Sequence, residues 1–185
     1  MRPMLFVTAA FAAVLIAPLV ACETAREPAG GPAMPLVNAS GQSIGTVRAW
    51  QTRGGVSFHI EAAGLPHGVH GLHVHGVGRC DPPDFASAGS HWNPAGRKHG
   101  MNNPQGPHAG DLPNVEVAAN GALAATVTLP GASLTAPAGT PGALLDADGA
   151  ALVIHAQADD YMTDPSGNSG ARIACAVITP TPEIR

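Results

Sequence analysis

The spread of glycine and proline along the chain is the feature that most limits its fold. The 185 residues include 23 Gly and 18 Pro, and no stretch of a dozen residues has a clean helical period. Both residue types break helices, which argues against a helical bundle. Apolar and polar residues alternate instead, as in the segment VSFHIE at 56–61. Such alternation is typical of strands with one buried face.

Besides the segment at 71–76 described below, strands are expected in five segments, each bounded by turn-forming residues. These segments are 44–51, 56–61, 123–129, 150–155 and 172–179. Short strands at this spacing predict an all-β fold, either an antiparallel sandwich or a barrel. Two long segments, 78–111 and 156–171, do not alternate and carry most of the polar chemistry. We therefore expect them to be functional loops.

Composition and charge narrow the class of protein. Only 12% of residues are charged, 45% are apolar, and the net charge is −4. A disordered tail would need more charge and fewer apolar residues, and a nucleic-acid-binding protein would normally carry a basic patch. One folded domain that binds no nucleic acid is the expectation.

The first 21 residues have the pattern of an export signal. Arg2 supplies the positive start, and Leu5 to Val20 form an almost wholly apolar run that Pro18 interrupts and that is short for a membrane span. The run Leu19-Val20-Ala21-Cys22 resembles a bacterial lipobox, which implies cleavage before Cys22 and its lipidation. The alternative is an ordinary cleaved signal followed by an incidental cysteine.

The expected organisation is a periplasmic lipoprotein held at a membrane. It consists of a signal peptide (1–21), a flexible tether rich in Pro and Gly (22–35) and a folded domain (36–185). Glu23 follows the cysteine, where an aspartate would favour the inner membrane, so the outer membrane is favoured. In an oxidising compartment Cys80 and Cys175 are expected to form a disulfide. Two buried thiols are the alternative.

Two histidines share one face of an expected strand in the segment GLHVHG at 71–76. Side chains two residues apart on a strand point the same way, so His73 and His75 project together while Leu72 and Val74 face the core. Two imidazoles on a rigid strand make half of a metal site. His155, at the end of the expected strand 150–155, is a further candidate ligand.

The first long loop adds four candidate ligands within 21 residues. They are His91, His99, His108 and Asp111. Three imidazoles and a carboxylate can complete a tetrahedral zinc site. Because the loop has little apolar material of its own, a bound metal would order it. The alternative is a solvated, histidine-rich loop.

The candidate ligands number seven, six histidines and one aspartate. Two four-coordinate sites need eight ligand positions, so one histidine that uses both ring nitrogens would balance the count. A single zinc site with spare histidines fits the spacing nearly as well. A site of imidazoles without Cys or Met suits Cu(II) or Zn²⁺.

At these residues the chain resembles the copper/zinc superoxide dismutase family. The matching pieces are GLHVH (71–75), Cys80, GSHWNP (89–94), RKHG (97–100), HAGDLPN (108–114), LVIHAQADD (152–160) and GNSGARIACAVI (167–178). They occur in the family's order and cover most of residues 36–180. The resemblance implies an antiparallel Greek-key β-barrel or sandwich, immunoglobulin-like in architecture, with two long functional loops. It also implies an enzyme that converts superoxide to O₂ and hydrogen peroxide.

The resemblance further implies one copper and one zinc ion per subunit. The implied copper ligands are His73, His75, His91 and His155, and the implied zinc ligands are His91, His99, His108 and Asp111. His91 would bridge the two ions and exchange a proton during turnover. Arg172 would hold the anionic substrate beside the copper.

Three other roles come from the same resemblance. Asp159 would link His73 of the copper site to His99 of the zinc site, and such acceptors fix ring orientation. Cys80 and Cys175 would form the family's disulfide within the subunit. The family's bacterial members include monomers and dimers, so a homodimer is one of two expected states.

The second long loop departs from the family's pattern. Animal-type members carry a lysine there, whereas 156–171 holds three aspartates and no lysine. Arg97 and Lys98 are the remaining cations that could attract superoxide, so weaker steering is expected. A copper-delivery protein and a zinc-stabilised structural domain are the alternative functions. The first typically lacks a copper ligand or the arginine, and the second would leave His155 and Arg172 idle.

Overall fold

The structure is a computed structural model that describes residues 30–135 and 142–179. The expected signal peptide and the expected lipidation site at Cys22 lie outside these residues. Within them, no helix has the length and apolar character needed to cross a membrane.

Strands account for nearly all of the regular structure. In chain order the elements are β1 (Met34–Asn38), β2 (Ser43–Thr52), β3 (Gly55–Ala62), β4 (Gly68–His70), β5 (Leu72–His75), the 3₁₀ helix η1 (Ala86–Ala88), β6 (Val115–Val117), β7 (Leu123–Pro130), β8 (Ala150–His155) and β9 (Arg172–Ile178). The described residues contain no α-helix, and every paired strand is antiparallel. The expected all-β class is confirmed.

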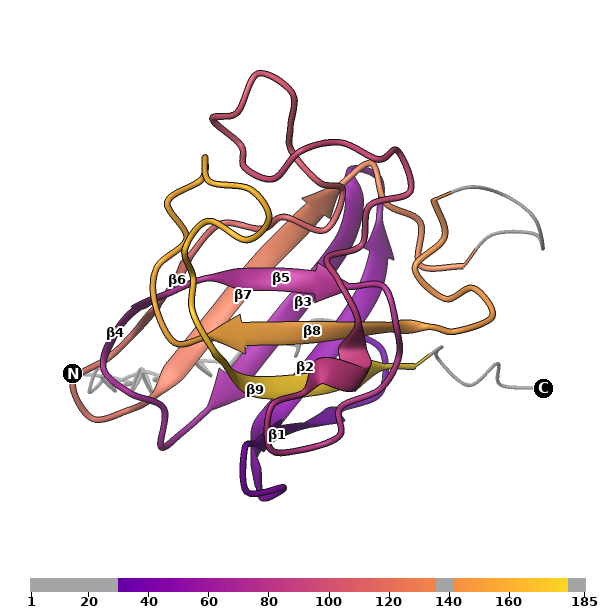
Figure 1. Cartoon of the computed structure of the whole chain (residues 1–185). Helices are drawn as coiled ribbons and strands as arrows, with labels where there is room; N and C mark the ends of the chain where they lie inside the picture. Colours follow the sequence, from indigo (N-terminus) through magenta and orange to yellow (C-terminus); the bar gives the residue numbers. More distant parts are fainter. Residues whose placement is uncertain (1–29, 136–141, 180–185) are drawn as a thin grey trace, which may run out of the picture.

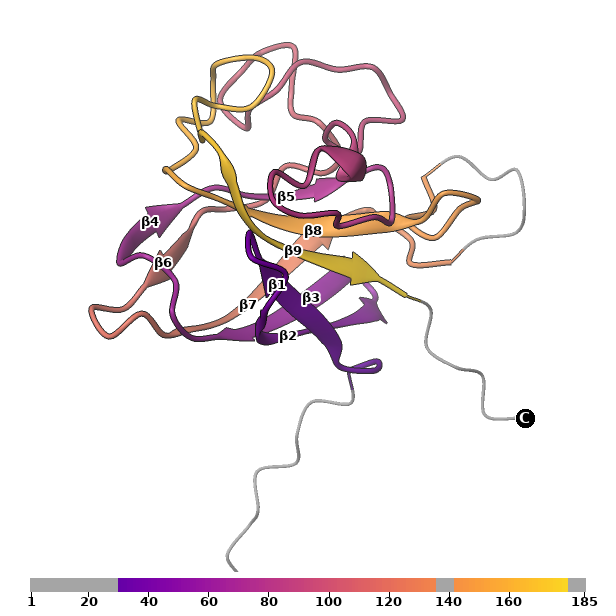
Figure 2. The same ribbon diagram turned by 60° about the horizontal axis from the view of Figure 1, so that its bottom comes forward.

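One curled sheet surrounds the core. Seven strands follow the order β5-β8-β9-β1-β2-β3-β7, and β4 pairs with β6 in a small second sheet (Figure 1). The curl brings β5 and β8 across from β2, β3 and β7 (Figure 2). Fully buried residues fill the space between them, including Phe58, Ile60, Leu72, Val74, Leu152 and Ile154. Alternate residues of each strand face this core, as the sequence pattern predicts.

Strand β8 is buried on both faces. Leu152 and Ile154 point into the main core, whereas Ala151 and Val153 pack in a second apolar cluster with Phe85. That cluster also contains Cys175, and a disulfide joins Cys80 of the first long loop to Cys175 of β9. The expected disulfide is therefore confirmed, and it holds the loop against β8 and β9.

The structure differs from the predicted tether at its C-terminal end. Strand β1 begins at Met34, inside the segment 22–35. The Gly31 N–H already donates to the Ala49 carbonyl oxygen at 3.2 Å. Pro35 makes this strand hard to predict from the sequence, because proline has no N–H to donate to a neighbouring strand. The strand tolerates it because β9 pairs only with the last two residues of β1.

Candidate metal centre

Strands β5 and β8 place three histidines on the outer face of the sheet. Leu72 and Val74 point into the core, so His73 and His75 point away from it. His155 ends β8 on the face that Ala151 and Val153 share. All three imidazoles are buried, and none is more than 3% exposed.

The first long loop returns twice to the free edge of β5. Isolated bridges join His75 to His91 and His73 to Asp111. The Val74 N–H donates to the Gly110 carbonyl oxygen at 2.8 Å. A β-carbon at Gly110 would lie 2.3 Å from the Val74 carbonyl oxygen, so only glycine permits this approach. The docking brings His91 and Asp111 beside the strand histidines.

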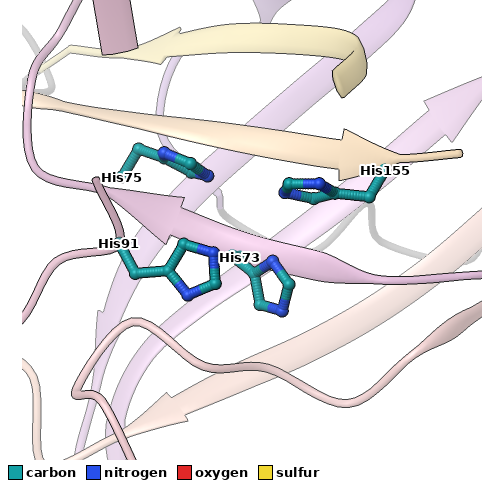
Figure 3. Close-up of side chains that lie close together, drawn as sticks. All are labelled: His73, His75, His91 and His155. Atoms are coloured by element: carbon teal, nitrogen blue, oxygen red, sulfur yellow. The ribbon is translucent and has the colours of Figure 1, made fainter. Parts of the chain in front are cut away.

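Four imidazoles converge at this edge, and the view in Figure 3 shows them turned toward one another. They are His73, His75, His91 and His155, whose ligand atoms can lie within 4.8 Å of each other. Each keeps one buried ring nitrogen without a hydrogen-bond partner: His73 Nδ1, His75 Nε2, His91 Nε2 and His155 Nε2. Unpartnered buried polar atoms are rare and costly. Four at one point indicate a site for a cation.

Hydrogen bonds at the opposite nitrogens orient three of these rings. The acceptors are Asp159 Oδ2 for His73 Nε2 (2.8 Å), the Gly89 oxygen for His75 Nδ1 (2.9 Å) and the Gly170 oxygen for His155 Nδ1 (3.2 Å). Each bond holds the ring proton on that nitrogen and leaves the other free to bind a metal.

Burial keeps the same three rings neutral. Desolvation lowers the pKa of His73 to about 4, that of His155 to about 3 and that of His75 to about 2. Because a metal binds the neutral imidazole, all three are ready ligands at pH 7.

A second group of ligand atoms meets at the other nitrogen of His91. The Nδ1 atoms of His91 and His99 are each 3.0 Å from Asp111 Oδ1. His108 Nδ1 is 3.3 Å from His91 Nδ1 and 3.4 Å from Asp111 Oδ1. In a tetrahedral site with zinc–ligand bonds of about 2.0–2.1 Å, ligand atoms lie about 3.3–3.4 Å apart. These four atoms therefore fit a zinc ion.

His73 also lies close to this second group, within 4.8 Å of ligand atoms from His91, His99 and Asp111. However, His73 is committed through Nε2 to Asp159 and turns Nδ1 to the first group. His108 Nδ1 instead faces His91 and Asp111, so His108 is the better fourth ligand.

Asp159 joins the two groups. Its Oδ2 accepts from His73, and its Oδ1 accepts from His99 Nε2 at 2.9 Å. A β-carbon at Gly167, whose φ is +63°, would lie within 2 Å of Oδ1, so glycine leaves room for the carboxylate. Two hydrogen bonds of 2.9 Å with the Asn114 side chain fix the Asp159 backbone. One rigid carboxylate thus orients a ring in each group.

Tyr161 and Asn114 complete this arrangement, and the sequence gives no sign of it. The Tyr161 N–H donates to Asp159 Oδ1 at 2.7 Å, and the Tyr161 hydroxyl accepts the Asn114 N–H at 2.8 Å. Tyr161 adopts a φ of +62°, which is unfavourable for a tyrosine and is typical of functional sites. Neither residue has ligand chemistry that would single it out.

Arg172 is fixed by two carbonyl oxygens of the first long loop. Its guanidinium donates to Phe85 at 2.5 Å and to Gly89 at 2.7 Å. These bonds leave other N–H groups of the guanidinium free. Arg172, Gly89 and Ser90 line an open cavity of about 820 Å³, and none of the four imidazoles lines it. Arg172 pairs with His155 across β8 and β9 and shares the Gly89 oxygen with His75, so the residue expected to hold an anion lies close to the four imidazoles.

The two cations expected to steer the substrate have other contacts. Arg97 donates twice to the Gly106 carbonyl oxygen, at 3.0 and 2.8 Å. The Lys98 ammonium lies 3.0 Å from Asp164 Oδ2. Arg97 thus makes its contacts within the first long loop, and Lys98 is paired with a carboxylate of the second.

Two relatives of this chain are named as copper/zinc superoxide dismutases. Superoxide dismutase [Cu-Zn] 1 of Aquifex aeolicus is 45% identical over 144 residues, 77% of this chain and 84% of the relative. The superoxide dismutase [Cu-Zn] of Caulobacter vibrioides is 45% identical over 139 residues, 75% of this chain and 79% of the relative.

Solved structures of a superoxide dismutase and of a similar protein have the same fold as this chain. A superoxide dismutase-like protein from Bacillus subtilis superposes with a TM-score of 0.76 at 46% identity, covering 81% of this chain and all of that one. The Cu/Zn superoxide dismutase of Brucella abortus gives a TM-score of 0.63 at 29% identity, over 80% of this chain and 99% of that one. The family model of copper/zinc superoxide dismutase matches residues 43–178. Together with the two imidazole groups, these matches place the chain in the copper/zinc superoxide dismutase family.

Proposed function

We propose that this superoxide dismutase holds copper at His73, His75, His91 and His155, and zinc at His91, His99, His108 and Asp111. The observation that carries the assignment is the set of four buried nitrogens without partners. His91 offers its remaining nitrogen to the second group, so it is the ligand that both ions would share.

The reaction converts two superoxide anions and two protons to O₂ and hydrogen peroxide. Copper supplies the one-electron couple that this needs, whereas zinc has no such couple and supplies charge and order. The Arg172 guanidinium attracts and orients the anion with its permanent charge and its free N–H groups. His91 Nε2, which has no hydrogen-bond partner in the protein, would hold a proton for the peroxide product when it is not bound to the metal.

A single substitution tests the copper assignment. The metal-free protein is loaded with copper and zinc, and superoxide removal is followed by stopped flow. His155→Ala should lose high-affinity copper and activity together. His59→Ala, which changes a histidine on β3 bonded only to Thr126 Oγ1 and near Glu61, is the matched control and should stay active. Full activity in His155→Ala, or activity without copper, would contradict the assignment.

We also propose that the chain is exported and anchored, at the outer membrane, through lipidated Cys22. The apolar run followed by Leu19-Val20-Ala21-Cys22 supports this. In a Gram-negative host, Cys22→Ser should move the protein from the membrane fraction to the soluble fraction, and intact mass should lose the acyl chains. An unchanged fractionation would refute the anchor. Sedimentation of the soluble form distinguishes a monomer from a homodimer.

A further inference from the structure

Asp164, in the second long loop, reaches across to the first long loop. Its Oδ1 accepts the His99 N–H at 2.8 Å, and its Oδ2 lies 3.0 Å from Lys98 Nζ. Oδ1 also lies 3.9 Å from His108 Nε2. One carboxylate therefore contacts or faces three residues of the loop, two of which are assigned as zinc ligands.

The position of Asp164 relative to His108 matters because of the ring's two nitrogens. His108 turns Nδ1 toward His91 and Asp111, so Nε2 points away from the zinc position. A histidine that binds a metal through one nitrogen carries its proton on the other, and a carboxylate there increases its strength as a ligand. Asp164 is the acidic residue that the described part of the chain places within 4.0 Å of His108 Nε2. At 3.9 Å the effect is electrostatic rather than a direct hydrogen bond.

The charges at the zinc position leave room for such an effect. Asp111 is the one carboxylate among the four ligands, so it offsets half of the charge of Zn²⁺. Asp159 supports His99 from the other side through Nε2. Among the described residues, Asp164 is the carboxylate that could support His108 through Nε2 in the way that Asp159 supports His99.

The ion pair with Lys98 does not by itself give Asp164 a role in stabilising the fold. The Lys98 and Asp164 side chains are 55% and 35% exposed, and pairs this exposed stabilise a fold very little. The hydrogen bond to the His99 backbone is different, because it fixes the main chain of a ligand-bearing residue.

We propose that Asp164 is a positioning residue for the zinc site: it fixes the His99 backbone and presents its negative charge to His108. The second long loop thereby helps to retain an ion whose ligands belong to the first. This inference rests on the zinc ligands assigned above.

Zinc affinity tests the proposal without reference to catalysis. The metal-free full chain is titrated with zinc against a chromophoric chelator. Asp164→Asn keeps an oxygen for the His99 N–H but removes the charge, and its zinc Kd should rise about tenfold. Asp164→Ala removes both contacts, and its zinc Kd should rise roughly 10–100-fold.

Two control variants separate the charge at this position from charge in general. Glu116→Gln makes the same change in net charge on β6, at a side chain without a hydrogen bond or ion pair to the described residues, and should leave the zinc Kd within about twofold. Lys98→Gln removes the cation but keeps the carboxylate, so its zinc Kd should be unchanged or lower. Cobalt bound in place of zinc should show altered visible bands in Asp164→Ala, while copper affinity stays the same.

The outcomes are distinguishable. If His108→Ala loses zinc but both Asp164 variants bind it as the unmodified chain does, the role of Asp164 is refuted and the ligand assignment stands. If His108→Ala binds zinc normally, the assignment fails and the inference with it. Should Asp164→Ala fail to fold by circular dichroism, Asp164→Asn decides.

Discussion

A single backbone oxygen joins Arg172 to one of the four converging imidazoles. The Gly89 carbonyl accepts the His75 Nδ1 proton at 2.9 Å and an Arg172 N–H at 2.7 Å. Because both bonds end on the same atom, the guanidinium has a fixed position relative to a proposed copper ligand. In the proposed role of Arg172, this fixed position would lower the cost of binding an anion.

Replacing Arg172 should separate substrate capture from metal binding. We expect Arg172→Ala to lower kcat/KM by roughly 10-fold to 100-fold, because a charge-assisted hydrogen bond contributes about 1.5–3 kcal/mol. Arg172→Lys should fall in between, since an ammonium cannot hold two carbonyls and an anion in one plane. Stopped-flow kinetics with copper analysis makes the measurement. Arg53→Ala, in the β2–β3 turn, is the control, and loss of copper from Arg172→Ala would contradict this role.

The sequence predicts which residues could bind a metal better than it predicts which residues hold those ligands in place. His73 and His75 can be placed on one face because strand geometry has a period of two. The contacts of Asn114 and Tyr161 with Asp159 depend on how two distant loops meet, which no local pattern encodes. The role of the Gly89 carbonyl cannot be predicted for another reason: every residue has a carbonyl, so the sequence does not single this one out.

At the scale of elements, the first long loop depends on a few anchors. Phe85 lies in the apolar cluster beneath the Cys80–Cys175 disulfide, and its carbonyl holds Arg172. The disulfide spans a sequence separation of 95 residues. Such a link removes much of the freedom of the unfolded chain.

Removing this link should destabilise the metal-free protein. In a Cys80→Ala and Cys175→Ala double variant, we expect the free energy of unfolding to fall by about 2–5 kcal/mol. Urea titration of the metal-free proteins measures it, because bound metal would add its own stabilisation. A Cys22→Ser variant keeps the disulfide and should match the unmodified chain. A loss below about 0.5 kcal/mol would show that the disulfide is not a main anchor.

Strands with a clear alternating pattern are predictable, and short ones are not. The expected segments 44–51 and 123–129 correspond to β2 and β7 within one residue at each end. β4 and β6 have three residues each, too few for a period to be recognised. β1 is missed because Pro35 interrupts its pattern. The order of strands in the sheet depends on contacts between segments far apart in the chain.

At the scale of the whole molecule, the metal-free protein holds its histidines in opposite states. Burial lowers the pKa of His73 to about 4 and that of His155 to about 3. Burial alone would also lower the pKa of His99, but hydrogen bonds to Asp111 and Asp159 raise it to about 9. Opposite shifts give opposite dependences of stability on pH.

The metal-free protein should be most stable near pH 6.5. As pH falls below about 6.5, the unfolded chain takes up protons that folded His73 and His155 refuse, so stability decreases. As pH rises from about 6.5 to 9, folded His99 keeps a proton that the unfolded chain has lost, and that stabilisation disappears. Urea unfolding at about pH 4.5, 6.5 and 9 tests both arms. Greater stability at either extreme would contradict the assigned protonation states, and the holoprotein should vary less.

The return of the first long loop to β5 has a consequence beyond the chemistry of the site. β5 is the last strand of the seven-stranded sheet, and the bridges to His91 and Asp111 cover its outer side. A strand left bare at that side is a template on which another chain can add. Since two of the proposed ligands form this cover, bound zinc and copper would help to hold the loop against the outer side of β5. The ions that take part in the reaction would then also make the protein less prone to aggregate.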